Sequence, residues 1–356
     1  MKLILAINPG STSTKIAVFE ESKQVFVRNI QHPVEDIKHF NKVTDQLNFR
    51  KEIIRKELNN SGLPLKYIKA IVGRGGLIKP VASGIIEVND ALKRDLYNSP
   101  LGEHASNLGG LIADELAKEM PDTKAFIVDP VVVDEFEDIA RISGHPLFER
   151  KSIFHPLNQK AVVRAHANSL NKKYEEMNFI VAHMGGGITI GAHKKGRVID
   201  VNNGLDAEGP ITPERSGNLP IGDVVNLCFS GKYSKEDVKL MLKGKGGFVA
   251  YFGTNNAYDI EKRAEAGDEK AALLQDALAY QVAKFIGAMS TVLKGEVDAI
   301  LLTGGLAFGK PIVDNITSRV SHIAQVFVYP GEDEMRALAM NGFRALSGDI
   351  NIIDYH

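Results

Sequence analysis

Hydroxyl and amide side chains gather around one cation near the start of the chain, between two short apolar runs. Residues 3–20 have the sequence LILAINPGSTSTKIAVFE, with Asn8, Ser11, Ser13 and Lys15 at its centre. A tight hairpin needs only two turn residues, so this turn carries more hydrogen-bond donors than its geometry requires. Because hydroxyl, amide and ammonium groups all donate to anions, we predict that the turn holds phosphate oxygens.

Two later glycine-rich turns could bind an anion through their backbone. One follows the apolar run that ends at 182, and the other follows the apolar run 299–302. Glycine lets the backbone approach a ligand closely, and successive N–H groups form anion-binding concavities. By itself, the second turn is equally typical of an ordinary strand-to-helix connection. The glycines of these turns are Gly185, Gly186, Gly187, Gly304 and Gly305.

Composition limits the kinds of partner. The 356 residues suggest about two domains, and 43 Lys and Arg against 44 Asp and Glu leave no overall field for nucleic acid or membrane surfaces. A single cysteine excludes internal disulfides and cysteine-built metal clusters. No apolar run is long enough for a membrane span, and the first residues lack the features of a signal peptide. We therefore expect a cytoplasmic protein that binds neither nucleic acid nor membrane.

Strand-like and helix-like segments are mixed along the whole chain. Short β-branched runs predict buried strands, and apolar residues at helical spacing predict helices between them. The order of these segments favours an α/β protein with mixed sheets flanked by helices. The expected strands are 3–7, 16–19, 25–27, 68–72, 125–128, 179–182, 299–302 and 326–328. The expected helices are 49–58, 108–120, 161–174, 224–229, 235–242, 271–293, 312–323 and 334–346.

The segment around the first turn resembles a second segment later in the chain. AINPGSTSTKIAVF at 6–19 aligns without gaps on VAHMGGGITIGAHK at 181–194, an offset of 175 residues. Each segment combines a strand, a turn and a second strand, and each then turns back into a third strand. The low identity leaves coincidence open. If the similarity is real, the chain has two related lobes whose turns face a polyphosphate.

Several common nucleotide and hydrolase motifs are missing. The chain has no G-x-x-x-x-G-K-[ST], no G-x-G-x-x-G after a strand, no G-x-S-x-G and no H-E-x-x-H. P-loop NTPases, Rossmann dehydrogenases, serine hydrolases and zincins therefore lose most of their support.

Five segments, in order, resemble those of the acetate and sugar kinase/Hsp70/actin superfamily, and within it the chain resembles the acetate kinase family. The resemblance covers nearly the whole chain and rests on AINPGSTSTKIAVF, HMGGGITIG, TPERSGNLPIGD and YPGEDEMRALA together. The segments are a first phosphate loop (8–15), a strand ending at Asp129, a second phosphate loop (183–187), a connecting helix (281–293) and an adenosine loop (303–306).

The resemblance implies two actin-like lobes with an active-site cleft between them. The first lobe would comprise 1–130 with 333–356, and the second 131–332. The implied activity is reversible phosphoryl transfer from ATP to a short-chain carboxylic acid, giving an acyl phosphate and ADP. The implied cofactor is Mg²⁺, and the implied partners are the carboxylate, the nucleotide and further copies of the chain in a homodimer or larger homo-oligomer.

Site residues follow from the same resemblance, motif by motif. The first loop supplies Asn8, Ser11, Ser13 and Lys15, and Gly304 and Gly305 lie on the adenosine side. An aspartate before proline commonly caps a strand, and lone arginines are usually surface residues; only the family pattern favours a functional role here. Glu334, in the acidic run 332–334, matches a metal-associated glutamate, with Asp129 as its partner. The implied catalytic set is Arg74, Asp129, His155, His183 and Arg215.

Differences between this sequence and the acetate kinase motifs indicate which carboxylic acid is preferred as the substrate. Gly76 and Ala207 stand where that family has larger residues around the methyl group of acetate, and Phe154 would complete the pocket. We therefore predict butyrate or a branched analogue over acetate, although one methylene is worth only about 1–3 kcal/mol. Gly186 replaces an asparagine, and Gln159 replaces a second histidine of the family motif.

Alternatives stay open at this point. The chain could be an acetate or propionate kinase, or an ATP-dependent switch of the actin/Hsp70 type without a small acceptor. A sugar kinase is a closer rival, but it would call for a carboxylate base and groups that bind sugar hydroxyls.

Overall fold

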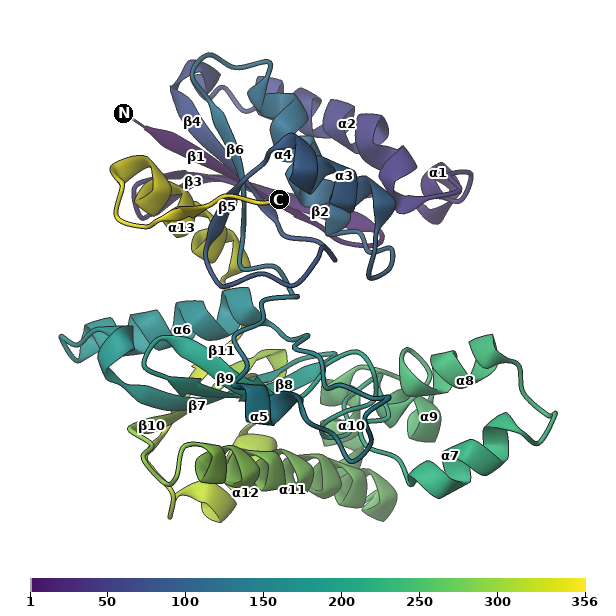
Figure 1. Cartoon of the computed structure of the whole chain (residues 1–356). Helices are drawn as coiled ribbons and strands as arrows, with labels where there is room; N and C mark the ends of the chain where they lie inside the picture. Colours follow the sequence, from purple (N-terminus) through teal and green to yellow (C-terminus); the bar gives the residue numbers. More distant parts are fainter. Residues whose placement is uncertain (1) are drawn as a thin grey trace. The chain divides into compact units, whose positions relative to one another are not determined.

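Two separate β-sheets organise the chain, one in each of two structural units (Figure 1). The computed structural model describes residues 2–356. Unit 1 comprises Met1–Val133 and Asp333–His356, and unit 2 comprises Asp134–Glu332. The first boundary therefore follows Val133, where the sequence placed it after residue 130. The chain thus leaves unit 1 once and returns to it for its last segment.

The sheet of unit 1 has seven strands in the order β12-β5-β6-β4-β1-β2-β3. Its first three strands form antiparallel hairpins, and β4 and β6 then add in parallel beyond β1. This arrangement brings the carboxyl ends of β1, β4 and β6 to one edge. The strands are β1 (Leu3–Pro9), β2 (Ser13–Glu20), β3 (Lys23–Gln31), β4 (Ile68–Arg74), β5 (Ile85–Glu87), β6 (Lys124–Val128) and β12 (Ile352–Ile353).

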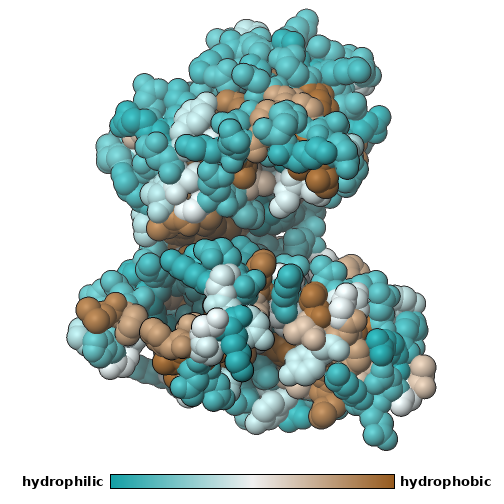
Figure 2. Space-filling view, turned by 90° about the vertical axis from the view of Figure 1, so that its right-hand side faces the viewer, coloured by the Kyte–Doolittle hydropathy of each residue, from teal (hydrophilic) through white to brown (hydrophobic). Residues whose placement is uncertain are grey.

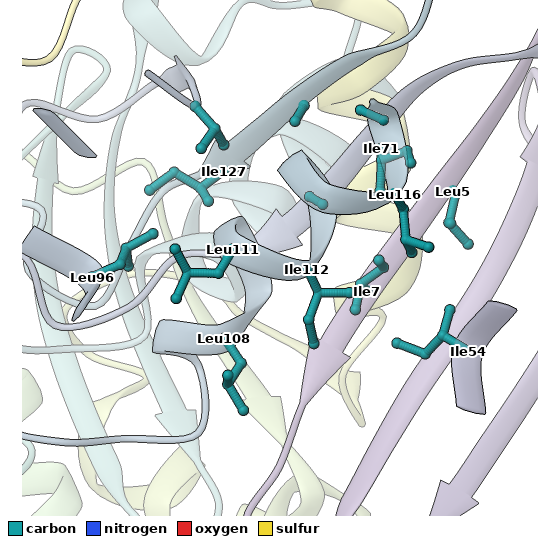
Figure 3. Close-up of a cluster of buried hydrophobic side chains, with 14 of the residues drawn as sticks. Leu5, Ile7, Ile54, Ile71, Leu96, Leu108, Leu111, Ile112, Leu116 and Ile127 are labelled. Atoms are coloured by element: carbon teal, nitrogen blue, oxygen red, sulfur yellow. The ribbon is translucent and has the colours of Figure 1, made fainter. Parts of the chain in front are cut away.

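Helices cover both faces of this sheet, as the alternation of side chains along β1 requires. Leu5 and Ile7 pack with Ile54 of one helix and Ile112 of another (Figure 3). On the other face, Gly342 of the last helix lies against Ile4 and Val72. The helices are α1 (Val34–Ile37), α2 (Leu47–Asn60), α3 (Asp90–Asn98), α4 (Asn107–Ala117) and α13 (Glu334–Ser347).

The sheet of unit 2 has five strands in the order β11-β10-β7-β8-β9. Strand β7 is central and buried throughout; β8 and β9 continue it as antiparallel hairpins, and β10 and β11 add in parallel on its other side. The strands are β7 (Asn178–Met184), β8 (Ile188–Lys194), β9 (Arg197–Val201), β10 (Ala299–Gly304) and β11 (Val326–Pro330).

Unit 2 also has a helical layer on each face of its sheet. Ile180 of β7 packs with Leu278 and Ile316 on one face, whereas Val181 packs with Val163 on the other. The long helix α11 begins at an N-cap, Asp268, whose side chain accepts hydrogen bonds from two backbone N–H groups. The helices are α5 (Asp138–Arg141), α6 (Pro156–Ser169), α7 (Ile221–Cys228), α8 (Lys235–Leu242), α9 (Gly247–Phe252), α10 (Ala257–Glu265), α11 (Glu269–Val292) and α12 (Lys310–Val320).

The two units share one topology, as the internal similarity between residues 6–19 and 181–194 suggests. In both, three antiparallel strands are followed by parallel strands added beyond the first. Strand β1 starts at Leu3 and β7 at Asn178, which gives the offset of 175 residues (178 − 3) found in the sequence. Asn8 and His183 therefore occupy equivalent positions at the ends of equivalent strands.

Polar residues dominate the face of the molecule that Figure 2 shows. Apolar residues are scattered over this face, and most large apolar side chains lie in the two cores. Among residues 2–356, no helix combines the length and apolar character that crossing a bilayer requires.

Candidate active site

The first phosphate loop is the connection between β1 and β2 in unit 1. The N–H of Gly10 donates to the carbonyl of Ser13 at 2.8 Å and closes the turn. Register pairs Asn8 with Lys15 across the two strands, so both side chains lie on one face. Thr14 points to the opposite face, since side chains alternate along a strand, and it is buried. The structure therefore separates the hydroxyls that the sequence groups together.

Arg50 of α2 binds the backbone of this loop, a role that could not be predicted from the sequence. The side chain is only 1% exposed. Its guanidinium donates to the carbonyls of Gly10 (2.7 Å), Ser11 (2.9 Å) and Ser13 (3.0 Å). Burial lowers the pKa of Arg50 to about 10. Because Arg50 binds the loop carbonyls and the hydroxyl of Thr14 on this side, the side chains of Asn8 and Lys15 are left for the opposite side.

Asn8, Arg74 and Glu334 form one cluster in unit 1. The strands β1 and β4 are parallel neighbours, so Asn8 and Arg74 lie together at their carboxyl ends. Glu334 opens α13, where a carboxylate also complements the helix dipole. Arg74 Nη1 lies 3.3 Å from each Glu334 carboxylate oxygen and 3.4 Å from Asn8 Oδ1. The Asn8 amide also donates to Glu334.

Asp129 follows β6 at the same edge of the sheet. Its Oδ1 accepts hydrogen bonds from the hydroxyl of Ser83 (2.7 Å) and the N–H of Gly84 (2.8 Å). Its φ of 37° is in the left-handed region, which is uncommon for a residue with a side chain. Such strain persists only where the surroundings fix it, and it is frequent at functional sites.

The second phosphate loop connects β7 and β8 in unit 2. The N–H of Gly185 donates to the carbonyl of Gly187 at 3.0 Å, and the hydroxyl of Thr212 donates to Gly186 O at 2.7 Å. The guanidinium of Arg215 lies where a Cβ on Gly187 would stand, and it donates to the carbonyl of Gly204. Burial lowers the pKa of Arg215.

Two stacked histidines lie beside this loop. The rings of His155 and His183 are 4.0 Å apart between centroids, with 22° between their planes. His183 Nδ1 lies 2.9 Å from Asn158 Oδ1, and its Nε2 lies 3.1 Å from a carboxylate oxygen of Glu332. His155 ends its loop at the N-cap of α6, with Nδ1 placed 2.8 Å from Thr189 Oγ1. Asn158 and Glu332 are contacts that the sequence did not indicate.

The adenosine loop lies next to the second phosphate loop within unit 2. Gly304 ends β10 with a φ of 91°, and Gly305 begins the short 3₁₀ turn η4 (Gly305–Phe308). A Cβ on Gly304 would stand 2.8 Å from the backbone nitrogen of Met184. Glycine is therefore required here by close approach as well as by its positive φ.

Comparison with known proteins assigns the chain to a family. The acetokinase family matches residues 145–324. Butyrate kinase 2 of Clostridium acetobutylicum is 53% identical over 345 residues, which cover 97% of each chain. The chain belongs to the acetokinase family.

Solved structures agree on the fold of this chain. An acetate kinase of Porphyromonas gingivalis matches with a TM-score of 0.79 at 19% identity, covering 97% of this chain and 100% of that one. A propionate kinase of Francisella tularensis matches with a TM-score of 0.76 at 20% identity, covering 96% and 99%. The mixed α/β fold with two actin-like units, predicted from the sequence, is therefore confirmed.

The surroundings of Gly76 differ from what the acid-pocket prediction assumes. From the sequence, the missing side chain of Gly76 is predicted to leave room for the acid. In the structure Asn107 occupies that place, and its Oδ1 accepts a hydrogen bond from the N–H of Leu77 at 2.8 Å. Gly76 is therefore a close-approach glycine, and its lack of a side chain opens no space.

The other two pocket residues lie in unit 2. Ala207 has a φ of 56° and is half-buried, and Phe154 is 2% exposed. Ala207 follows Asp206, which accepts a hydrogen bond from the amide of Asn203 at 3.1 Å. Phe154 directly precedes His155 in the sequence and belongs to unit 2 with Ala207, whereas Gly76 belongs to unit 1.

The chemistry of the carboxylates fits a magnesium site. Asp129 and Glu334 both belong to unit 1, and Mg²⁺ in nucleotide enzymes takes one or two carboxylates together with phosphate oxygens and water. Among residues 2–356, no group of three or more His, Cys, Asp or Glu side chains forms a metal site. Protein ligands alone would thus be too few, and the phosphates would have to complete the coordination.

Proposed function

We propose that this member of the acetokinase family is a butyrate kinase, which transfers the γ-phosphoryl group of ATP to butyrate and gives butyryl phosphate and ADP. The observation that carries the proposal is the 53% identity to butyrate kinase 2 over 97% of both chains. In the reaction, a carboxylate oxygen forms a bond to the γ-phosphorus while the bond from that phosphorus to the β,γ-bridging oxygen breaks. The reverse reaction follows the same course.

Little proton transfer is needed, because butyrate is already ionised near neutral pH. The protein must instead hold two anions in line and offset their repulsion. Arginine suits this task, since its planar fork can bind carboxylate or phosphate oxygens through two parallel hydrogen bonds. Each unit supplies one arginine from the expected set, Arg74 in unit 1 and Arg215 in unit 2.

To unit 1 we assign the binding of the carboxylic acid and of the metal ion. Arg74 would bind the carboxylate of butyrate, and the contact with Glu334 would hold its guanidinium in place. Asn8, Ser11, Ser13 and Lys15 would bind phosphate oxygens from the face of the first loop opposite Arg50. Asp129 and Glu334 would hold Mg²⁺, which would offset charge on the phosphates.

To unit 2 we assign the binding of the transferring phosphoryl group and of the nucleotide. Arg215 Nε is buried without a hydrogen-bond partner among residues 2–356, so one donor of this guanidinium is left for a ligand. His155 and His183 would donate to phosphoryl oxygens. The N–H groups of Gly185, Gly186 and Gly187 would bind the phosphates, and Gly304 and Gly305 would contact adenosine.

The experiment is an ATP-dependent hydroxamate assay, in which hydroxylamine traps the acyl phosphate. Acetate, propionate, butyrate, isobutyrate and valerate are compared at equal concentrations, each with Mg²⁺ and with excess chelator. Formation of ADP with glycerol serves as the control for a hydroxyl acceptor. We expect the highest kcat/KM with butyrate and no hydroxamate in the presence of the chelator.

Each other outcome would change the proposal in a defined way. A kcat/KM for acetate or propionate equal to that for butyrate would make the protein a broader carboxylate kinase. ADP formed with glycerol but with no acid would indicate a sugar-kinase-like acceptor. Steady ATP hydrolysis without any hydroxamate would favour an actin/Hsp70-type switch.

We propose in addition a homo-oligomer in the cytoplasm, which the resemblance of the sequence to acetate kinases suggests. Light scattering coupled to size-exclusion chromatography measures the mass directly. We expect a multiple of 38.9 kDa, and a single-chain mass at micromolar concentration would overturn this part of the proposal.

A further inference from the structure

A chain of buried polar side chains runs behind the histidine pair of unit 2. Tyr174 OH lies 2.7 Å from His193 Nδ1, and His193 Nε2 lies 2.9 Å from Gln159 Oε1. Gln159 Nε2 contacts Thr189 through both the carbonyl (3.0 Å) and Oγ1 (2.9 Å). Thr189 Oγ1 then reaches His155 Nδ1 at 2.8 Å. These residues belong to α6 and its N-cap, to β8 and to the 3₁₀ turn η3 (Tyr174–Glu176) that precedes β7.

The backbone fixes the direction of these hydrogen bonds, starting at Gln159. The carbonyl of Thr189 can only accept, so the group of Gln159 that faces it must be the amide NH₂. The oxygen Oε1 is then turned toward His193. Gly191 leaves the space for this orientation, because a Cβ there would stand 2.7 Å from Oε1.

His193 is thereby assigned as the Nε2–H tautomer. Its Nε2 faces an acceptor oxygen and must donate, which leaves Nδ1 to accept from the hydroxyl of Tyr174. Burial lowers the pKa of His193 well below its usual value, and the positive charges of Lys160 and Arg164 lower it further. The neutral ring is therefore the form present, with one proton and one lone pair on its two nitrogens.

The hydroxyl of Thr189 determines which nitrogen of His155 accepts a hydrogen bond. Thr189 is fully buried, and its Oγ1 already accepts from the amide of Gln159. A buried hydroxyl hydrogen normally finds an acceptor, and His155 Nδ1 at 2.8 Å is such an acceptor. A neutral His155 then carries its proton on Nε2.

We propose that Gln159 and Thr189 are positioning residues that hold His155 as the Nε2–H tautomer, so that His155 presents a hydrogen-bond donor to the transferring phosphoryl group. The role given to the donor rests on the proposed kinase function; the tautomer itself rests only on the contacts within unit 2. The replacement of the family's second histidine by Gln159 is then significant. A glutamine side chain does not titrate, so the donor and acceptor roles in the hydrogen bonds of Gln159 do not change with pH.

The tautomer is measured directly by NMR of protein labelled with ¹⁵N-histidine, without substrate. Two-bond ¹H–¹⁵N correlation spectra distinguish the two neutral tautomers by the nitrogen shifts and the correlation pattern. The variant His155→Gln identifies the signal of His155. We expect Nε2–H with Nδ1 as an accepting nitrogen in the wild-type protein, and an Nδ1–H form there would overturn the proposal.

Thr189→Val tests the positioning role, because it removes the hydroxyl at nearly constant volume. We expect a mixture of both His155 tautomers and a kcat lowered by about 10- to 100-fold, the worth of one hydrogen bond to a charged group, with KM for ATP changed much less. Thr189→Ser, which keeps a hydroxyl, should restore the wild-type tautomer. An unchanged tautomer in Thr189→Val would contradict the proposal.

A matched control comes from α11. Thr291 is exposed, and its hydroxyl only reaches the carbonyl of Ala288 in its own helix at 2.7 Å. Thr291→Val should leave the His155 spectrum and kcat unchanged. If the assay gives no acyl phosphate with any acid while the tautomer is as assigned, the proposed function fails and the assignment within unit 2 stands.

Discussion

At the scale of single residues, the guanidinium of Arg215 depends on a neighbour that has no side chain. A Cβ added to Gly187 would overlap this guanidinium, although the φ of Gly187 is not in the left-handed region. The glycine therefore makes room for the arginine, and its own backbone conformation is open to other residues. The sequence predicted that this glycine lets the backbone approach a ligand closely; the structure shows in addition that it makes room for the side chain of Arg215.

Gly187→Ala should displace Arg215 and leave the fold intact. A misplacement of about 1 Å in a transfer site can reduce the rate about 100-fold, so we expect kcat/KM for butyrate to fall by about that factor. Gly287→Ala in α11 is the control, because nothing lies within 4 Å of its added Cβ. Steady-state kinetics and thermal unfolding measure both variants, and full activity in Gly187→Ala would contradict the assigned place of Arg215.

Replacement of either arginine should be more severe than that of the glycine. A charge-stabilising arginine is worth about 10³–10⁵ in the rate of phosphoryl transfer, and we expect losses in that range for Arg74→Ala and Arg215→Ala. Arg319→Ala is the control, since this residue of α12 contacts Asn315 of its own helix at 2.8 Å. A loss below tenfold in kcat/KM would remove the arginine concerned from the catalytic set.

At the scale of elements, the first phosphate loop is shaped by a helix that follows it in the chain. Arg50 of α2 binds three carbonyls of the loop and also the hydroxyl of Thr14 at 3.1 Å. Gln46 Oε1 accepts hydrogen bonds from Nε and Nη2 of Arg50 and completes the surroundings of the guanidinium. The loop and α2 therefore behave as one structural element, although about 40 residues separate them.

Arg50→Met should leave the loop carbonyls without their donor. Each buried acceptor that loses its partner costs about 1–3 kcal/mol, so the free energy of unfolding should fall by about 3 kcal/mol or more. The KM for ATP should rise, because the loop loses the conformation in which it faces phosphate. Urea unfolding and kinetics measure the two effects.

Arg55→Met on the same helix is the matched control for Arg50→Met. Arg55 is half-exposed and forms surface ion pairs with Glu52 and Glu119. Surface pairs contribute only about 0–1 kcal/mol, and neither stability nor KM should change appreciably. Equal effects of the two substitutions would contradict a specific role of Arg50.

At the scale of the whole molecule, buried histidines couple stability to pH in both units. Burial and the charge of Arg50 lower the pKa of His32 to about 4, compared with 6.5 for a free histidine. Burial also lowers the pKa values of His166 and His193. Between pH 6.5 and 4 the unfolded chain therefore binds more protons at His32 than the folded chain does. The free energy of unfolding falls as the pH falls through this range.

Replacement of His32 should flatten this pH dependence. One histidine contributes at most about 1.4 kcal/mol per pH unit, so His32→Gln should lose less stability than the wild-type protein between pH 6.5 and 5. Urea unfolding at both pH values measures the difference. His356→Gln is the control, since that side chain is 84% exposed. A slope in His32→Gln equal to that of the wild type would contradict the pKa assigned to His32.

Much of the architecture could be predicted because strand and helix periodicity are local properties. The strands at 3–7 and 299–302 and the helix from 334 are present almost as predicted. The helix predicted at 161–174 instead starts at Pro156 and ends at Ser169. Its first five residues include the buried polar residues Asn158, Gln159 and Lys160. Polar residues on an inner face hide the apolar period, so the start of this helix could not be found from the sequence pattern.

By itself, the sequence determined the fold class, the repeated strand-turn-strand motif and the residue types of a phosphate-binding enzyme. These features depend on local patterns and on spacing along one chain. Only the tertiary structure decided which atoms meet. It placed Arg50 behind the first loop, Asn107 in the space beside Gly76, and Gln159 and Thr189 behind His155. Each of these contacts joins residues that are 30 or more positions apart in the sequence. Their geometry depends on packing between elements, which no single segment of the sequence encodes.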